Sequence, residues 1–439
     1  MGNLKAGFAK LDITGFRGQF VSGYYRGRNA KGVIDPLYIT AVAFSDGENT
    51  AVLISSDLLG MYGATMGQSD RVANEAAVAN GLPEGSVFFH MTHTHTGPGV
   101  GFGDDLSEYE VFLKHRIEDV IAIALEDMKP VKGIYGSNDG IVEDTAYVRR
   151  LRMKSGKVYT WGKFEDPNIE DYAEEVDKSL RLIKIEREND KEIIIVNFQM
   201  HPDTLGGMDY CSDYVGALRN MVEREIPNSR CIFFDGAEGD VTASNYKGPA
   251  PEKGYEVRTK RLGENIAREA IRIYKDLKAL KGDKVKIFNE YYDCPTKRNP
   301  AEVPESKRII ELHESGRDAE LGHQGIVNCL VSHAYNILTL EKDKRDTMQL
   351  KVSGVRVGDF CFIGMPCEPF CEIGRRVRAH SKFAITCVTC QTNGSVGYIM
   401  LAEDFDNGGY EPASTKVKRG SGELLIEVSN RVADKLYED

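Results

Sequence analysis

The sequence predicts one large α/β domain with mixed sheets flanked by helices. Short apolar segments of strand length alternate with segments of helical periodicity along the chain. No linker rich in Pro, Gly or Ser, no low-complexity tract and no internal repeat interrupts this alternation. A chain of 439 residues is also long enough to bury a large core. We therefore expect residues 1–439 to form a single domain.

The predicted strands are apolar runs rich in β-branched and aromatic residues. They cover residues 38–45, 51–56, 86–92, 192–198, 231–235, 348–355 and 384–389. The first predicted helix has apolar residues at helical spacing between residues 113 and 128, and Ser107 with Glu110 has the spacing of a capping box. Further helices are predicted at residues 255–278, 301–315, 369–379 and 421–437, with the charged segment 299–320 on the surface.

The charge balance excludes some classes of partner. The net charge is −11 and Lys and Arg are scattered, whereas a nucleic acid or an anionic membrane calls for a basic patch. The N-terminal residues have no apolar core of signal-peptide length, and no run is long enough to span a membrane. We expect a cytoplasmic protein, unless the chain has been trimmed, with a small-molecule substrate and no stable membrane insertion. The oligomeric state is left open.

The nine cysteines cannot all pair, which favours a reducing compartment. Five of them lie between residues 361 and 390, and Cys387 and Cys390 have the spacing of a zinc knuckle or a redox pair. Residues three apart on a strand face opposite sides, so small buried thiols are the preferred interpretation of this cluster. Its role is left open.

Two histidines follow an apolar run and enter a glycine-rich loop. Residues 88–99 read Phe-Phe-His-Met-Thr-His-Thr-His-Thr-Gly-Pro-Gly. On an extended backbone His93 and His95 share one face and His90 points to the other. Neutral imidazole is a common zinc ligand, and the glycines leave room for an open metal site. The alternatives are a histidine pair without metal and a phosphate loop, which Pro98 disfavours because it lacks an N–H.

A second predicted strand also ends in a histidine. Residues 193–202 read Ile-Ile-Ile-Val-Asn-Phe-Gln-Met-His-Pro, and Pro202 favours an extended conformation of His201 at the strand end. This histidine is either a metal ligand or a core residue that is hydrogen-bonded to the backbone.

These segments resemble the motifs of the neutral ceramidase family. The family motif His-Thr-His-Ser-Gly-Pro-Gly is similar to residues 92–99, and its Gly-Asp-Val-Ser nucleophile loop is similar to Gly-Asp-Val-Thr at residues 239–242. Several motifs in one order imply the fold of the family's catalytic domain. The remaining matches are its His-Pro segment at residues 200–202, the glutamate before its Gly-Arg-Arg helix at Glu368, and its C-terminal tyrosine motifs at residues 397–399 and 410–415.

The resemblance implies a single zinc ion (Zn2+) held by His93, His201, Glu368 and Tyr398. Two neutral imidazoles and one carboxylate leave zinc electrophilic, and a weakly held tyrosine oxygen leaves room for water or substrate. Without the resemblance, Glu368 would be an ordinary acidic residue at a helix start and Tyr398 a packed strand aromatic.

The resemblance also implies which groups act beside the metal. His95 would shuttle a proton, and Tyr410 and Arg149 would stabilise a developing oxyanion. The family's nucleophilic serine falls on Thr242, whose methyl group stiffens the side chain and crowds a nucleophile next to a metal. The expected substrate-binding residues are Gly23 and Asp240.

The sequence therefore predicts a zinc-dependent hydrolase in which zinc-activated water attacks an amide or a related carbonyl, such as a lactone. The longer family enzymes that cleave ceramide carry a C-terminal β-sandwich, which residues 1–439 do not include. This difference, Thr242 and the absence of an export signal favour a substrate smaller and more polar than ceramide. The first alternative is a true ceramidase or N-acyl-lipid amidase. The second is a catalytically decayed relative that binds metal.

Overall fold

Two β-sheets stacked face to face form the centre of the molecule. The computed structural model describes residues 2–25, 27–61, 67–103, 105–322 and 324–438. Among these residues the larger sheet has nine strands. Its order is β16 (Ser229–Asp235), β14 (Glu192–Phe198), β13 (Ser179–Arg187), β8 (Lys129–Ile141), β1 (Lys5–Asp12), β5 (Tyr38–Ser45), β6 (Thr50–Ser56) and β7 (Val87–Met91), with β18 (Lys278–Ala279) paired to β8.

The smaller sheet packs against the inner face of the larger one. Its order is β19 (Val285–Pro295), β20 (Thr347–Val357), β21 (Phe360–Gly364) and β23 (Ile385–Thr389). Apolar side chains of both sheets meet in one buried cluster, which includes Phe44, Phe88 and Phe234 from the larger sheet and Phe360 and Phe362 from the smaller. Burying such aromatic side chains is the main stabilising contribution between the layers.

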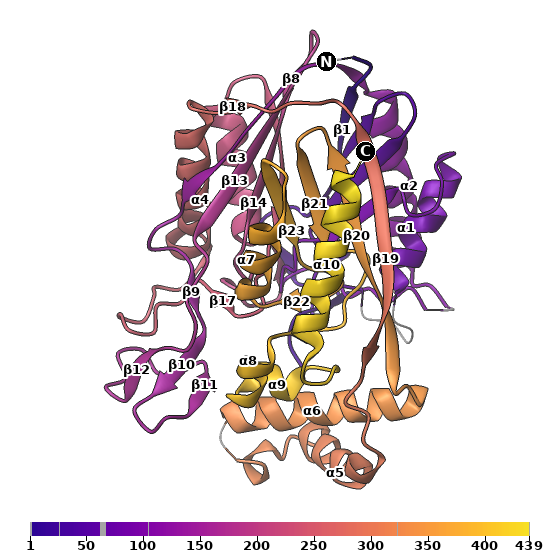
Figure 1. The fold of residues 1–439 in the computed structure, drawn as a ribbon. Helices are drawn as coiled ribbons and strands as arrows, with labels where there is room; N and C mark the ends of the chain where they lie inside the picture. The colour runs from indigo at the N-terminus through magenta and orange to yellow at the C-terminus, as the bar shows by residue number, and fades with distance from the viewer. Residues whose placement is uncertain (1, 26, 62–66, 104, 323, 439) are drawn as a thin grey trace.

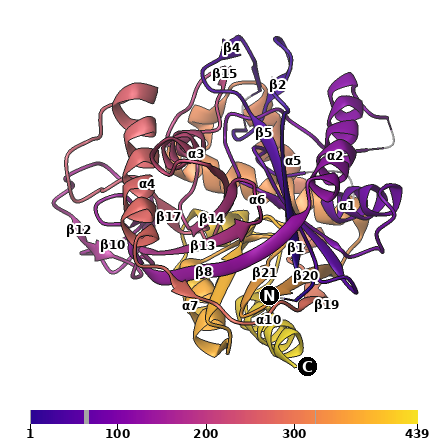
Figure 2. The same cartoon turned by 90° about the horizontal axis from the view of Figure 1, so that it is seen from above.

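Helices cover the two outer faces, so the layers run helix, sheet, sheet, helix (Figure 1). Over the larger sheet, α1 (Gln68–Ala79) and α2 (Glu108–Glu126) cover one half, and α3 (Tyr214–Glu225) and α4 (Lys260–Tyr274) cover the other (Figure 2). The smaller sheet is covered by α7 (Cys371–His380) and α10 (Ser421–Tyr437). The predicted α/β class with mixed sheets flanked by helices is therefore confirmed.

Short elements surround this body, mostly at the end of the sheets where α6 (Gln324–Asp343) lies in Figure 1. Helix α6 packs on α5 (Val303–Glu314) with a small core of its own. The other short elements are β2 (Phe20–Val21), β3 (Arg28–Asn29), β4 (Gly32–Val33), β9 (Tyr147–Val148), β10 (Arg150–Met153), β11 (Val158–Thr160), β12 (Ile169–Tyr172), β15 (Asp209–Tyr210), β17 (Val241–Thr242), β22 (Glu368–Pro369), β24 (Tyr398–Ile399), α8 (Ala402–Asp406) and α9 (Tyr410–Ser414).

Several predicted elements match the structure at both ends. The strands expected at residues 38–45 and 192–198 are β5 and β14, and the helix expected at 421–437 is α10. The capping box is confirmed, because Ser107 Oγ accepts from Glu110 N at 3.3 Å while Glu110 Oε2 accepts from Ser107 N at 2.9 Å.

Two helix boundaries differ from the prediction. The helix expected at 369–379 begins at Cys371, because Glu368 and Pro369 pair with another strand instead. The helix expected at 255–278 opens with a π-helical turn (Tyr255–Thr259) and ends at Tyr274, before β18. The charged segment 299–320 lies at the surface as predicted, and the helix predicted at 301–315 is α5, whose buried face contacts α6.

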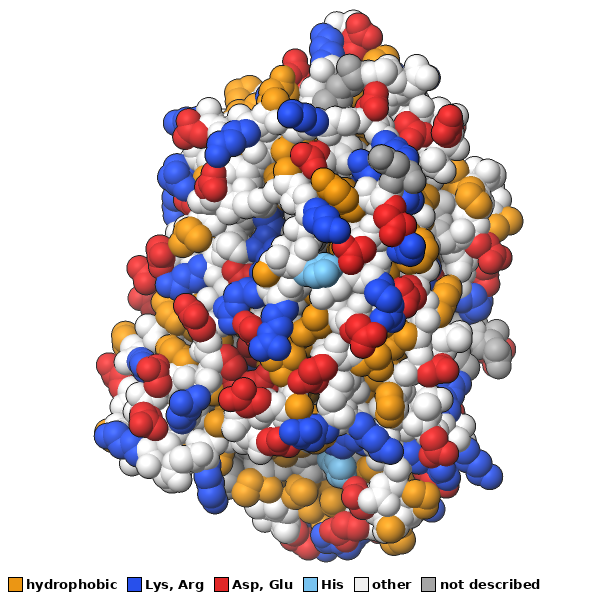
Figure 3. Space-filling view, viewed as in Figure 1, with side chains coloured by type: hydrophobic (Ala, Val, Ile, Leu, Met, Phe, Trp, Pro, Cys, Tyr) orange, Lys and Arg blue, Asp and Glu red, His pale blue; other side chains and the backbone are white. Residues whose placement is uncertain are grey.

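The surface carries charges of both signs. Figure 3 shows Lys and Arg side chains intermixed with Asp and Glu over the visible face. Within the described ranges, no helix is both long enough and apolar enough to cross a membrane.

Candidate metal centre

The candidate site lies where the loops that leave several strands come together. Strand pairs β6 and β7, β14 and β16, and β21 and β23 are each parallel, so the loops after the two strands of a pair start side by side. A cavity of about 510 Å³ opens there. The predicted site residues that line it are Gly23, His93, His95, Glu368, Tyr398 and Tyr410.

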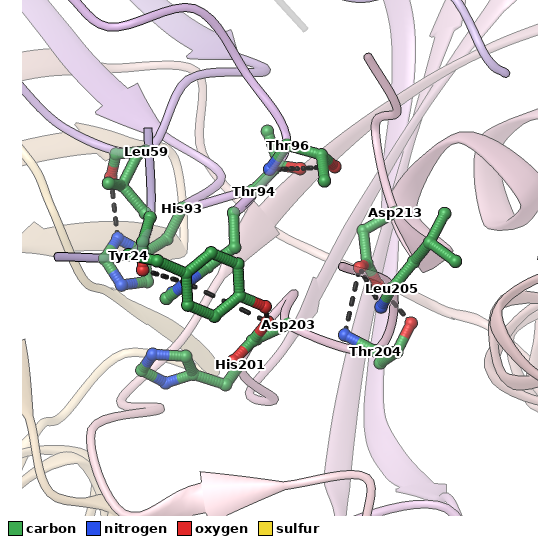
Figure 4. Close-up of polar contacts among 12 residues, drawn as sticks. Tyr24, Leu59, His93, Thr94, Thr96, His201, Asp203, Thr204, Leu205 and Asp213 are labelled. Atoms are coloured by element: carbon green, nitrogen blue, oxygen red, sulfur yellow. Dashed lines mark hydrogen bonds and ion pairs between the residues drawn. The ribbon is translucent and has the colours of Figure 1, made fainter. Parts of the chain in front are cut away.

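His93 and His95 leave β7 through a turn. The prediction that an extended backbone gives them one face is wrong, because β7 ends at Met91 and His93 has φ 68°, in the left-handed region. Two hydrogen bonds hold this strained residue: its amide donates to Leu58 O at 2.9 Å, and its ring Nδ1 donates to Leu59 O at 2.6 Å (Figure 4). The rings of His93 and His95 nevertheless lie close, with centroids 5.1 Å apart.

His201 follows β14 and is fixed by the loop that leaves the neighbouring strand β16. Its amide donates to Val241 O at 3.2 Å, and its ring Nδ1 is in close contact with the carboxylate of Glu238. A carboxylate on Nδ1 sets the orientation of the ring and leaves Nε2 available as a ligand, which is the usual arrangement around metal-binding histidines.

Glu368 and Tyr398 reach the cavity from two short paired strands. Strands β22 and β24 are parallel, with Glu368 opposite Tyr398 in register, and Glu368 N donates to Gly397 O at 3.0 Å. The loop after β16 packs directly on β22, since a Cβ at Gly239 would lie only 2.5 Å from Glu368 O. This close approach brings Glu368 and Glu238 to the same centre.

The side chains of His93, His201 and Glu368 converge on one point. His93 Nε2 and His201 Nε2 lie 3.4 Å and 3.7 Å from Glu368 Oε2. Both His201 Nε2 and Glu368 Oε2 are buried without a hydrogen-bond partner. Because unpaired buried polar atoms are costly, and because two imidazoles with one carboxylate are a typical zinc donor set, these residues fit a metal ion.

Two overlapping groups among the described residues could hold a metal ion. One consists of His93, His201, Glu238 and Glu368, and the other consists of His93, His95 and His201. In the first group Glu238 contacts His201 Nδ1, on the opposite side of the ring from the Nε2 that faces Glu368. Glu238 therefore lies behind a candidate ligand, where it contacts Nδ1 of the ring.

The charges of the site favour the ligand forms of Glu368 and His201 and the protonated form of His93, which must lose that proton to bind a metal. Burial acts to raise the pKa of Glu368, but His93, His201 and Arg149 outweigh it and lower the pKa to about 2. Burial acts to lower the pKa of His93, but Glu368 outweighs it and raises the pKa to about 9. Burial lowers the pKa of His95 and of His201 well below the usual value. His95 and His201 are thus neutral imidazoles that can accept a proton or bind a metal.

Arg149 contacts Tyr398 at the edge of the site. Its Nε donates to Glu411 Oε1 at 2.8 Å, its guanidinium carbon lies 5.1 Å from the ring centroid of Tyr398, and its Nη2 is buried without a partner. Burial acts to lower the pKa of Arg149, but Tyr398 and Glu411 outweigh it and raise the pKa, so the guanidinium stays charged. The neighbouring Arg150 turns away to Glu174, at 3.0 Å.

Tyr410 lies on the cavity wall next to Tyr398. Its hydroxyl is 2.7 Å from the hydroxyl of Tyr25, and its ring centroid is 5.8 Å from that of Tyr398. Burial raises its pKa well above the usual value, so Tyr410 presents a neutral phenol that can donate a hydrogen bond.

Gly23 supports His95. Its carbonyl accepts from His95 Nδ1 at 3.0 Å, which leaves His95 Nε2 without a partner. Gly23 has φ 113°, and a Cβ there would lie 2.8 Å from His95 Cβ. Only glycine can adopt this conformation and this approach without strain.

Asp240 and Thr242 are not among the described residues that line the cavity. Asp240 is buried, and its carboxylate accepts from Cys371 N at 2.7 Å at the start of α7. A carboxylate is favourable there because it satisfies an amide at the positive end of the helix. Thr242 is half-buried and pairs with Tyr147 in the short β17–β9 ladder, directly after the residue that holds His201.

Sequence reasoning missed three groups at this site. Glu238 lies three residues after the end of β16 and contacts His201. The sequence signal that could have identified it is an acidic residue shortly after a strand that pairs with the strand leading to His201. Asp203 accepts a hydrogen bond from Tyr24 (Figure 4). Its carboxylate also lies 3.9 Å from His95 Nδ1. Lys416 lines the cavity and directly follows the tyrosine motif at residues 410–415.

The cysteines have no partner thiol in the structure. All nine are free, and eight of them are buried, with Cys329 partly exposed. Cys387 lies in the core between the two sheets, whereas Cys390 lies beside Glu238. Burial raises the pKa of both thiols, which is the expected behaviour of small buried side chains.

Solved structures of neutral ceramidase share this architecture. The crystal structure of neutral ceramidase from Pseudomonas aeruginosa has a TM-score of 0.73 at 17% identity, covering 99% of this chain and 75% of that one. A ceramidase complexed with C2 has a TM-score of 0.73 at 16% identity, covering 100% of this chain and 76% of that one. No family model and no curated protein matches the sequence. The resemblance seen in the motifs is thus confirmed at the level of the fold, and this chain has a neutral ceramidase-like fold.

Proposed function

We propose that this chain is a zinc-dependent hydrolase that cleaves an amide or a related carbonyl compound. The observation that carries the proposal is the convergence of His93 Nε2, His201 Nε2 and Glu368 Oε2 at one cavity, with two of these atoms buried and unpaired. The structural similarity to solved ceramidases supports the proposal, because those proteins have the same fold and are named as hydrolases.

His93, His201 and Glu368 would hold the ion, with Tyr398 as a weaker fourth ligand on the strand beside Glu368. When bound, zinc supplies a Lewis acid that activates water and polarises a carbonyl. Nδ1 of His93 is hydrogen-bonded to Leu59 O, and Nδ1 of His201 contacts Glu238, so both rings present Nε2 to the proposed ion.

His95 is the proposed proton shuttle. Its Nδ1–H is committed to Gly23 O, and burial keeps the imidazole neutral, so Nε2 is left as a proton acceptor inside the cavity. Arg149, through its unpaired Nη2, and the Tyr410 hydroxyl are the proposed donors to an oxyanion that develops on the substrate.

The proposed substrate is smaller and more polar than ceramide. The cavity has a volume of about 510 Å³, and part of its wall is polar. Cavities of this size suit a compact ligand. The polar side chains on this part of the wall are Ser332, Asn336, Ser414 and Lys416.

Metal analysis combined with a panel of carbonyl substrates tests the proposal. We expect about one zinc per chain, which is the stoichiometry of a single three-residue or four-residue site. The panel contains short N-acyl compounds, lactones and long-chain ceramide. A protein that binds zinc but hydrolyses none of them would contradict the proposed activity and favour the decayed metal-binding relative.

A second candidate is an N-acyl-lipid amidase or a true ceramidase. Phe20, Tyr24 and Tyr25 line the cavity and are 47%, 42% and 41% exposed, so an apolar surface lies at its entrance. Such a surface could receive an acyl chain. Efficient hydrolysis of long-chain ceramide in the same panel would replace the first candidate with this one.

A further inference from the structure

Lys416 is the single lysine or arginine among the described residues that line the cavity. It lies on the segment after α9, directly after Thr415, whose hydroxyl donates to Tyr398 O at 2.6 Å. The backbone at Lys416 is fixed as well, because its carbonyl accepts from Lys297 N at 2.8 Å. The side chain is therefore presented from a rigid segment that also supports Tyr398.

The ammonium group of Lys416 has no hydrogen-bond or ion-pair partner among the described residues. Glu368 is the one carboxylate on the cavity wall within the described ranges, and its Oε2 faces His93 and His201. Burial lowers the pKa of Lys416, and Glu368 only partly offsets this. A desolvated cation without an anion is costly, so a bound anion would stabilise it.

Ser414 provides a second unpaired group on the same wall. Its side chain is 8% exposed, lines the cavity, and its Oγ has no hydrogen-bond partner. Its backbone carbonyl, in contrast, accepts from Asn336 Nδ2 on α6, which holds the residue in place. Ser414 and Lys416, two residues apart, thus both line the cavity, and the polar side-chain group of each is unpaired.

We propose that Lys416 and Ser414 bind a carboxylate of the substrate. This inference rests on the proposed function, because it assigns a substrate class to the same cavity. The substrate would be a short N-acyl compound whose scissile carbonyl lies at His93, His201 and Glu368 while its carboxylate lies at Lys416. The exposed aromatic residues Phe20, Tyr24 and Tyr25 would contact its acyl part.

A carboxylate fits the donors better than a phosphate does. One ammonium and one hydroxyl match a singly charged group with two oxygens. Phosphate sites in proteins usually add an arginine or several backbone N–H groups at a helix N-terminus. Among the described residues on this wall, neither an arginine nor the N-terminus of a long helix is present.

Two hydroxamates of equal length test the proposal on the zinc-loaded protein. One ends in a carboxylate and the other in a carboxamide, and three spacer lengths (succinyl, glutaryl and adipyl) cover the distance. The hydroxamate anchors each compound at the metal, so the ratio of the two dissociation constants reports the far end alone. We expect the carboxylate to bind about 10-fold to 100-fold more tightly at its best length.

Lys416→Met should remove this preference, and Lys416→Arg should keep part of it. Lys418→Met is the matched control, because Lys418 is exposed two residues further along the same segment. Circular dichroism and melting temperature show whether each variant folds. A wild-type protein without preference at any length, or a preference that Lys416→Met leaves unchanged, would overturn the proposal.

A metal-independent arm separates this inference from the proposed function. Hexanoate and hexanamide are titrated into protein that a chelator has stripped of metal. We expect hexanoate to bind to wild type and Lys418→Met but not to Lys416→Met, and hexanamide to bind equally weakly to all three. If the protein binds hexanoate but binds neither zinc nor the hydroxamates, the proposed hydrolase is refuted and the anion site is supported. Equal binding of hexanoate to all three proteins would refute the anion site.

Discussion

Replacing Glu238 with glutamine should weaken metal binding without unfolding the protein. Glu238 is fully buried and contacts His201 Nδ1, so it orients the ring as a ligand through Nε2. Burial raises the pKa of Glu238 to about 8, so its carboxyl group can take up the Nδ1 proton or release one as the ring binds a metal. Glutamine has nearly the same shape and its amide oxygen can accept a hydrogen bond from Nδ1, so the substitution removes only the ability of the side chain to ionise. Loss of such a partner costs about 10-fold to 100-fold in metal affinity, which is about 1.4 to 2.8 kcal/mol.

Competition with a chromophoric zinc chelator measures the affinity of wild type and Glu238→Gln. Asp240→Asn is the matched control, because Asp240 is a second buried carboxylate on the same loop that contacts Cys371 instead of an imidazole. We expect the control to bind zinc as wild type does while its melting temperature falls. Equal zinc affinity in wild type and Glu238→Gln would refute the positioning role.

The remaining predictions concern the ligands, the proton shuttle and the threonine. His93→Ala and His201→Ala should each abolish zinc binding and keep the melting temperature near that of the metal-free protein, since each variant loses one of the three converging ligand atoms; full zinc occupancy in either variant would argue against the ligand set. His95→Ala should retain zinc and lose about 100-fold or more in turnover; loss of zinc from this variant would instead make His95 a ligand. Thr242→Val should lower kcat/KM by a factor that corresponds to a loss of about 1 to 3 kcal/mol in transition-state stabilisation. Thr242→Ser should gain no activity on ceramide. Complete inactivation by valine would indicate that Thr242 is a nucleophile.

The local elements of the fold could be predicted from residue patterns. Strands β5 and β14 match their predicted bounds because runs of β-branched residues are both apolar and of strand length. Helix α10 and the capping box at Ser107 are also local patterns, because the residues that form them are close together in the sequence. Strand β8, in contrast, contains Lys129 and seven further polar or glycine residues, and its mixed burial hides it from a hydrophobicity pattern.

The candidate site could be predicted only in part. His93, His201, Glu368 and Tyr398 were selected by motif. In the structure His93, Glu368 and Tyr398 line one cavity, and His201 Nε2 faces Glu368 Oε2. The conformation that presents His93 was predicted incorrectly. Its positive φ depends on hydrogen bonds to the loop after β6, which a pattern within residues 88–99 does not contain.

By itself the sequence determined the alternating elements, the histidine-rich loop and the motif order, because each is encoded by neighbouring residues. Tertiary structure alone decided that Glu238 lies behind His201, that Glu368 and Tyr398 stand in register, and that Lys416 faces the cavity without an anion. These relations arise from the pairing of β14 with β16 and of β22 with β24, between segments far apart in the chain. Such pairings are selected by the packing of the whole core, which local patterns do not encode.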